Sequence, residues 1–120
     1  MAKEIFHPEV EQIQLSTVLD ALSDPIRRNI ALGLAEVGEQ NCSSFTALCA
    51  KTNLTYHYIR LREAGLIKVR TEGSQRLITL RADDIEARFP GVLAAILAAA
   101  RRERRLDVRC GIAAGMRTLE

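Results

Sequence analysis

The chain has 120 residues, of which 48% are hydrophobic and only 4% aromatic, with no tryptophan. This composition suits one small domain and excludes an aromatic core, so the core must be built from Leu, Ile, Val and Ala. No run of 18 apolar residues occurs and the N-terminal stretch lacks a signal-peptide core, so we expect a cytoplasmic protein with no membrane partner.

Apolar spacing predicts helices in the first part of the chain. A loosely patterned helix is expected over 10–22. Asp24 can cap the next helix, with Pro25 at its first position, and Gly38 ends it. We expect a loop and then a short helix, over 39–43 and about 44–50 respectively.

The middle of the chain changes from helical to alternating apolar spacing. Thr52 is predicted to cap a helix over 52–63, which Gly65 ends. From Leu66 the apolar residues recur every second position, which predicts a β-hairpin over 66–81.

Two further helices are expected in the last third. Asp83 or Asp84 can cap a short helical turn through Phe89. Pro90 then begins a longer helix, 90–105, and the tail 106–120 is weakly patterned. No internal repeat or second domain is visible, so residues 1–120 are interpreted as one domain.

This order of elements predicts a mainly α fold with a β-hairpin wing, the winged helix-turn-helix. Residues 44–63 would form the helix-turn-helix pair, whose second helix enters a major groove of DNA. Residues 66–81 would form the wing.

Charge is unevenly distributed in a way that fits a polyanionic partner. Residues 1–50 carry three basic and seven acidic side chains, whereas residues 51–81 carry seven basic and two acidic ones. On the outward face of helix 52–63, Arg60 suits a phosphate or guanine, Asn53 suits adenine, and Tyr56 suits a phosphate or a thymine methyl. The wing adds candidate phosphate contacts at Lys68, Arg70 and Arg76.

Two other interpretations of this face remain open. A solvated charged hairpin would explain the wing, and a winged-helix protein–protein interaction module would use the same fold. The second predicts a neutral or acidic outer face, whereas helix 52–63 has no acid before Glu63.

Two stretches resemble the ArsR/SmtB-type bacterial transcriptional repressors. They are LDALSDPIRRNIALGLAE and KTNLTYHYIRLREAGLIKVRTEGSQRLITL, and the resemblance covers roughly residues 15–100. It implies a homodimeric repressor that binds double-stranded operator DNA and releases it on a signal. It also implies DNA contacts from Lys51, Thr52, Asn53, Thr55, Tyr56 and His57. At Arg60, many members of this family carry an apolar residue instead.

The residues for a divalent-metal sensor of this family are not evident. A Cys-x-Cys pair is absent near the helix-turn-helix, and helix 90–105 contains no histidine. We therefore predict neither a metal site nor a cofactor. Arsenite or a soft metal remains an alternative if Cys42, Cys49 and Cys110 converge.

Thiol oxidation or an electrophile is a second hypothesis for the signal. Cys42 lies in a polar loop, where a nearby helix N-terminus could lower its pKa, and Cys110 lies in the tail. Cys49 is more typical of a small buried residue. An unknown effector, or none, remains open. Enzyme motifs such as a Gly-rich phosphate loop, HExxH or G-x-S-x-G are absent, so no enzymatic activity is predicted.

The helices at the two ends of the domain suggest how two copies would assemble. Helix 90–105 carries Val92, Leu93, Ile96 and Leu97 with alanines around them, and helix 10–22 offers a second apolar face. We predict a two-fold dimer through these helices, with the wings at its outer ends.

Overall fold

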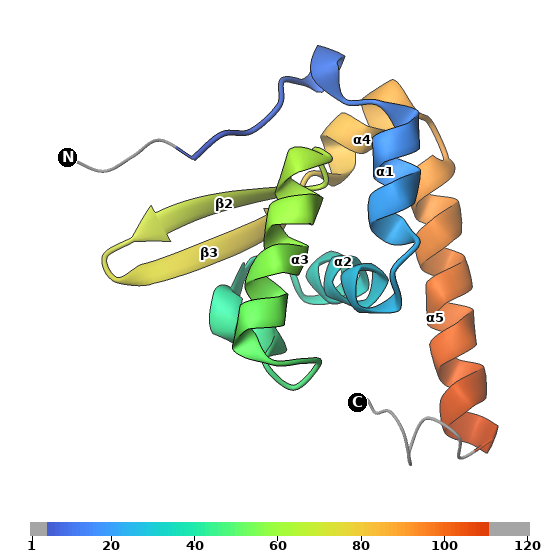
Figure 1. Ribbon diagram of the computed structural model, residues 1–120. Coiled ribbons are helices and arrows are strands. Elements are labelled where there is room, and N and C mark those ends of the chain that lie inside the picture. The colour runs from blue at the N-terminus through green and yellow to red at the C-terminus, as the bar shows by residue number, and fades with distance from the viewer. Residues whose placement is uncertain (1–4, 111–120) are drawn as a thin grey trace.

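The computed structural model describes residues 5–110, and the side chains of residues 5–106 (Figure 1). This part of the chain is mostly helical with a small antiparallel sheet, which confirms the predicted winged helix-turn-helix fold. In chain order the elements are η1 (Val10–Gln12), α1 (Leu15–Leu22), α2 (Pro25–Val37), β1 (Gln40–Asn41), η2 (Cys42–Phe45), α3 (Lys51–Glu63), β2 (Ile67–Glu72), β3 (Gln75–Leu80), α4 (Ala82–Arg88) and α5 (Val92–Cys110), where η marks a 3-10 helix.

The wing is the β2–β3 hairpin, which the alternating sequence pattern predicted. Its register runs from Ile67 opposite Leu80 to Glu72 opposite Gln75. Ile67 and Val69 are buried while the residues between and after them are exposed, as expected for a strand with one face on the core. Gly73 forms the tip with φ of 62°, a conformation that favours glycine.

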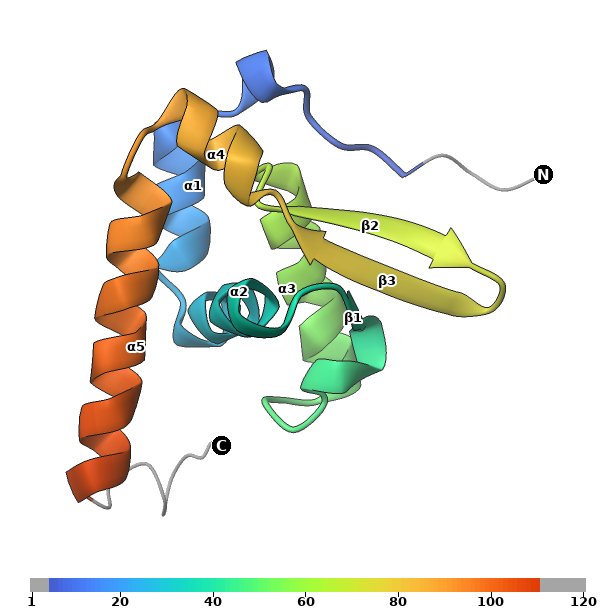
Figure 2. The same ribbon diagram turned by 180° about the vertical axis from the view of Figure 1, so that it is seen from behind.

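The core lies where the first three helices meet the base of the sheet. Its fully buried side chains are aliphatic, as the composition required: Ile13, Val18, Ile30, Leu32, Leu54, Leu61, Leu66, Ile67, Ile78 and Ile85. Figures 1 and 2 show α5 and the wing at opposite sides of this body. None of the helices described is long and apolar enough to cross a membrane.

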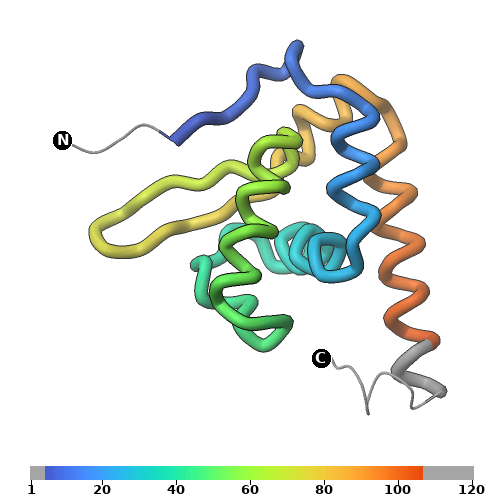
Figure 3. The backbone as a smooth tube through the Cα atoms, in the orientation of Figure 1, coloured from blue at the N-terminus to red at the C-terminus, as the bar shows by residue number. Residues whose placement is uncertain are grey.

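The predicted helix over 10–22 is divided into η1 and α1. Ile13 has extended backbone (φ −72°, ψ 128°), and its carbonyl accepts two hydrogen bonds from Arg88, at 3.1 and 2.6 Å. Its side chain is buried against Gly65, whose φ is 85°. The break turns Ile13 into the core, and Figure 3 shows the chain changing direction before α1.

The segment before α3 also differs from the prediction. Gln40 and Asn41 form a short third strand beside β3, in place of the expected loop, so the sheet order is β1-β3-β2. The short helix expected at about 44–50 is a 3-10 helix that starts earlier, because the Asn41 side chain accepts a hydrogen bond from Ser43 N–H at 2.9 Å.

Three helix starts are shifted by one to three residues. α3 begins at Lys51 with Ala50 in the capping position and no side-chain cap, so Thr52 lies within its first turn. α4 follows Arg81 rather than an aspartate cap. α5 begins at Val92 and continues to Cys110, beyond the predicted end.

Candidate nucleic-acid interface

α3 presents one face to the core and a polar face to solvent. Leu54, His57 and Leu61 are buried at helical spacing. The opposite face has no acid before Glu63, and Tyr56 on it is 55% exposed. The exposed polar side chains from the first two turns are those predicted from the sequence: Lys51, Thr52, Asn53, Thr55 and Tyr56.

The middle and the C-terminal turn of α3 are held by hydrogen bonds to distant segments. The Tyr58 hydroxyl donates to the carbonyl of Cys42 in η2. Burial raises the pKa of Tyr58, so the hydroxyl keeps its proton and remains a donor at neutral pH. Arg62 donates to the Phe6 carbonyl of the N-terminal segment. Both contacts fix the orientation of the helix, which a base-reading surface requires.

His57 differs from the other predicted DNA contacts because its ring is buried. Arg27 lies 3.2 Å from His57 Nδ1 and also donates to the Ala21 carbonyl at 2.7 Å. A guanidinium only donates hydrogen bonds, so Nδ1 accepts. Burial, with a smaller effect from Arg27, lowers the pKa of His57, and Asp24 opposes this. His57 therefore joins α3 to α2 and supports the exposed face.

Two of the predicted contact arginines are already paired with carboxylates. Arg60, half-exposed as expected for an outward position, forms an ion pair with Asp20 of α1. Arg70 of the wing makes two hydrogen bonds to Glu39, at 3.0 and 3.1 Å, which hold the pKa of that carboxyl below its ordinary range. Both pairs are solvent-accessible, so a phosphate can compete with each carboxylate.

Lys68 and Arg76 are the other two predicted wing contacts. Both are exposed, and neither makes an ion pair with any residue that the structure describes. By the strand register, Arg76 shares the face of Val69 and lines the hollow beside α3, whereas Lys68 lies on the opposite face of the hairpin. Arg76 therefore extends the basic surface of α3, and Lys68 places a cation on the other side of the wing.

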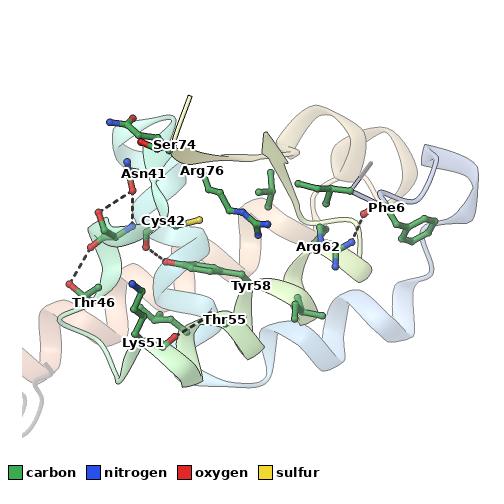
Figure 4. A pocket seen from close by; sticks show the side chains of 16 residues that line it. Phe6, Asn41, Cys42, Thr46, Lys51, Thr55, Tyr58, Arg62, Ser74 and Arg76 are labelled. Carbon is green, nitrogen blue, oxygen red and sulfur yellow. Dashed lines mark hydrogen bonds between the residues drawn. The ribbon is translucent and has the colours of Figure 1, made fainter. Parts of the chain in front are cut away.

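A hollow of about 650 Å³ separates α3 from the wing (Figure 4). It is bounded by α3, η2, the strands of the wing and the N-terminal segment. Lys51 and Thr55 line it from the helix, and Arg76 lines it from the wing. The hollow was not anticipated from the sequence, because the position of the N-terminal segment has no local sequence signal.

The thiols do not have the environment that was expected. Cys42 and Cys49 are both half-buried, and burial raises the pKa of each. The expected lowering of the Cys42 pKa by a helix N-terminus is therefore wrong, although Arg76 acts weakly in that direction. The Cys110 side chain lies outside the described part. Within that part, no group of three or more Cys, His, Asp or Glu side chains is placed to hold a metal.

Comparison with known proteins agrees with the class that this fold defines. The chain is 34% identical over 79 residues to YceK of Bacillus subtilis, an uncharacterized helix-turn-helix-type transcriptional regulator; the match covers 63% of this chain and 79% of the relative. The crystal structure of an ArsR family transcriptional regulator superposes with a TM-score of 0.54 at 24% identity, covering 83% of this chain and 97% of the other. No protein-family profile matches the chain.

The chain therefore belongs to the helix-turn-helix transcriptional regulators. Its fold is the winged helix-turn-helix of the ArsR type.

Proposed function

We propose that this chain is a sequence-specific DNA-binding regulator, a binding protein rather than an enzyme. The observation that carries the proposal is the exposed polar face of α3, free of acids through its first three turns, next to the exposed cations of the wing. A duplex that receives α3 in its major groove would bring the wing against the neighbouring backbone.

The contacts divide into those that read bases and those that hold phosphates. Asn53 and Tyr56 lie on the exposed face of α3 and are assigned to base edges. Lys51, Lys68 and Arg76 are assigned to phosphates, which position the protein without reading sequence. Because several cations are assigned to phosphates, we expect the affinity for DNA to fall markedly as the salt concentration rises.

Arg60 and Arg70 would bind DNA by exchange of one anion for another. Each is already paired with a carboxylate, Asp20 or Glu39, which limits its freedom to rotate. A phosphate that replaces the carboxylate therefore meets a side chain already ordered.

We further propose that the protein represses transcription as a homodimer and leaves DNA on a signal. Leu15 and Leu19 of α1 are 42% and 46% exposed, and Leu106 of α5 is similarly exposed. Because these leucines are apolar and exposed, they support an interface in which α1 and α5 of one copy pack against α1 and α5 of a second copy. Oxidation or alkylation of Cys42 is one proposed signal, because this thiol lines the hollow beside the DNA-contacting side chains.

Selection of genomic fragments by the purified protein, followed by gel shifts on the enriched site, tests the proposal. Tyr56→Ala and Arg60→Ala should each weaken binding to the selected site by about 1–3 kcal/mol while the fold is kept. Arg76→Ala should weaken specific and unrelated DNA alike and reduce the salt dependence. Asp83→Ala, at an exposed position on α4 outside both the DNA-contacting surface and the helices of the proposed dimer, serves as the control.

Unchanged shifts in all three variants would overturn the groove-binding proposal. Failure of the wild type to enrich or shift any DNA would favour the protein–protein interaction module instead.

A further inference from the structure

The hollow between α3 and the wing has a strongly one-sided charge. Its lining includes three cationic side chains, Lys51, Arg62 and Arg76, and no Asp or Glu among the described residues. Figure 4 shows Arg76 reaching from the wing toward the middle of the hollow, while Arg62 of α3 points toward the Phe6 carbonyl. Arg62 donates to a backbone carbonyl and not to a carboxylate. The space is therefore electrostatically suited to an anion.

The same hollow also has an apolar side, with which an inorganic ion would gain no favourable contact. Leu54 and Ile59 of α3, Val69 of β2 and Ile5 and Phe6 of the N-terminal segment contribute to its lining. Phe6 and Ile59 are among the exposed large hydrophobic side chains of the protein. An apolar body in the hollow would remove them from water.

The volume of the hollow favours a small molecule over a bare ion. The volume of about 650 Å³ lies within the range of roughly 300–1,000 Å³ that is common for small-molecule sites. The polar lining groups near the cations, including Ser43, Thr46 and the Cys42 thiol, can fix the orientation of a ligand.

We propose that this hollow binds a small organic anion with an apolar body, such as an aromatic carboxylate. The carboxylate pairs with Arg76, and the ring lies against Leu54, Ile59 and Val69. Arg76 suits this role because it makes no ion pair with the described residues and can offer two parallel N–H groups.

The regulatory consequence rests on the proposed function. Lys51, Thr55 and Arg76 line the hollow and also belong to the proposed DNA-contacting surface. A bound anion would neutralise Arg76 and occupy the space next to α3, so anion and DNA would exclude each other. The two affinities must then depend on each other reciprocally.

Calorimetric titration of the DNA-free protein tests the site without reference to DNA. The probe is 1-naphthoate, with 1-naphthylmethanol as the neutral analogue and inorganic phosphate as the anion without an apolar body. We expect 1-naphthoate to bind more tightly than either. Arg76→Gln should weaken 1-naphthoate binding about tenfold, the usual size for loss of a charged hydrogen-bonding partner. Arg102→Gln on α5 removes the same charge and should bind as the wild type does.

A second measurement adds 1-naphthoate to the complex with selected DNA, which it should dissociate. Absence of 1-naphthoate binding, equal binding of the neutral analogue, or an unchanged Arg76→Gln affinity would each overturn the site. Binding of 1-naphthoate by a protein that binds no DNA would overturn the proposed function and leave the site in place. Simultaneous binding of both would overturn the mutual exclusion.

Discussion

Both histidines of the chain are held in the neutral form by their surroundings. His7 Nε2 accepts a hydrogen bond from the backbone N–H of Val69 at 3.0 Å, and His57 Nδ1 accepts from Arg27. Burial is the largest cause that lowers the pKa of each below the ordinary value of 6.5, and nearby arginines lower it further. Protonation would remove both acceptors, so each histidine supports the fold only when it is neutral.

The free energy of unfolding should therefore depend on pH just below neutrality. In the unfolded chain the two histidines bind protons near pH 6.5, whereas in the folded chain they bind them only at lower pH. The histidine contribution to the free energy of unfolding is therefore fully present above pH 6.5 and is lost as the pH falls toward the lower folded pKa values. Urea unfolding between about pH 7.5 and about pH 5.5 measures this window. The double variant His7→Gln/His57→Gln should show a much flatter profile, and an equally steep one would contradict the assignment.

The reactivity of Cys42 follows from its raised pKa. Since the thiolate is the nucleophile, alkylation of Cys42 by iodoacetamide at neutral pH should be slower than that of a free cysteine derivative. If Cys42 nevertheless transmits a signal, peroxide or a strong electrophile should release DNA from the wild type and leave Cys42→Ser bound. Release that persists in Cys42→Ser, or a wild type indifferent to both reagents, would remove Cys42 as the sensor.

At the scale of elements, the turn between α3 and the wing brings the backbone close against the buried Ile13 side chain. Gly65 has φ of 85°, and a Cβ at this position would lie 2.6 Å from a buried side-chain carbon of Ile13. Gly65→Ala should lower the free energy of unfolding by about 2–4 kcal/mol, from backbone strain and overpacking together. Urea denaturation of the purified variant measures the loss.

Gly73 at the tip of the wing provides the matched control. Its φ is 62°, but a Cβ there meets no atom within 4 Å, so only the backbone cost of about 1 kcal/mol applies. Equal losses in the two variants would show that the contact with Ile13 does not contribute.

The elements that sequence reasoning predicted well are those with a regular apolar pattern. In the wing, buried apolar residues occur at every second position, and in α3 the buried Leu54 and Leu61 lie on one face of the helix. β1 was missed because two polar residues, Gln40 and Asn41, carry no pattern. The short helix near η2 was misplaced because the Asn41 side chain, and not an apolar periodicity, decides where it begins.

Within the candidate interface, sequence patterns predicted which side chains face outward but not what they contact. Tyr56 and Asn53 are exposed as expected. The ion pair of Arg60 joins residues 40 positions apart, and the hydrogen bond between Arg27 and His57 spans 30 positions. Such contacts depend on how α1 and α2 pack against α3, and local sequence propensities do not determine that packing.

At the scale of the whole molecule, the proposed reading of DNA by one short helix would require a second copy. Two recognition helices about 34–36 Å apart would match successive half-sites. α1 and α5 lie on the side of the molecule away from the wing (Figures 1 and 2), which leaves the wings at the outer ends of a dimer built on these helices.

Leu19→Asp tests this arrangement. Leu19 is 46% exposed, so an aspartate there should spare the fold but place a charge in the proposed dimer interface. Sedimentation should show a dimer for the wild type and a monomer for Leu19→Asp at micromolar concentration. Val37→Asp, at the C-terminal end of α2 and also exposed, should remain dimeric. A wild-type monomer that binds a palindromic site tightly would refute the arrangement.

The N-terminal segment has a consequence for how the chain is made. Its three anchors are the Phe6 carbonyl with Arg62, the His7 ring with Val69 and the Pro8 carbonyl with Arg81, and their partners lie 56, 62 and 73 positions further along. During synthesis these residues leave the ribosome long before any partner exists. The loop must close before these contacts form, so this segment, although translated before its partners, docks only after they have folded. Its docking then marks the completion of α3 and the wing.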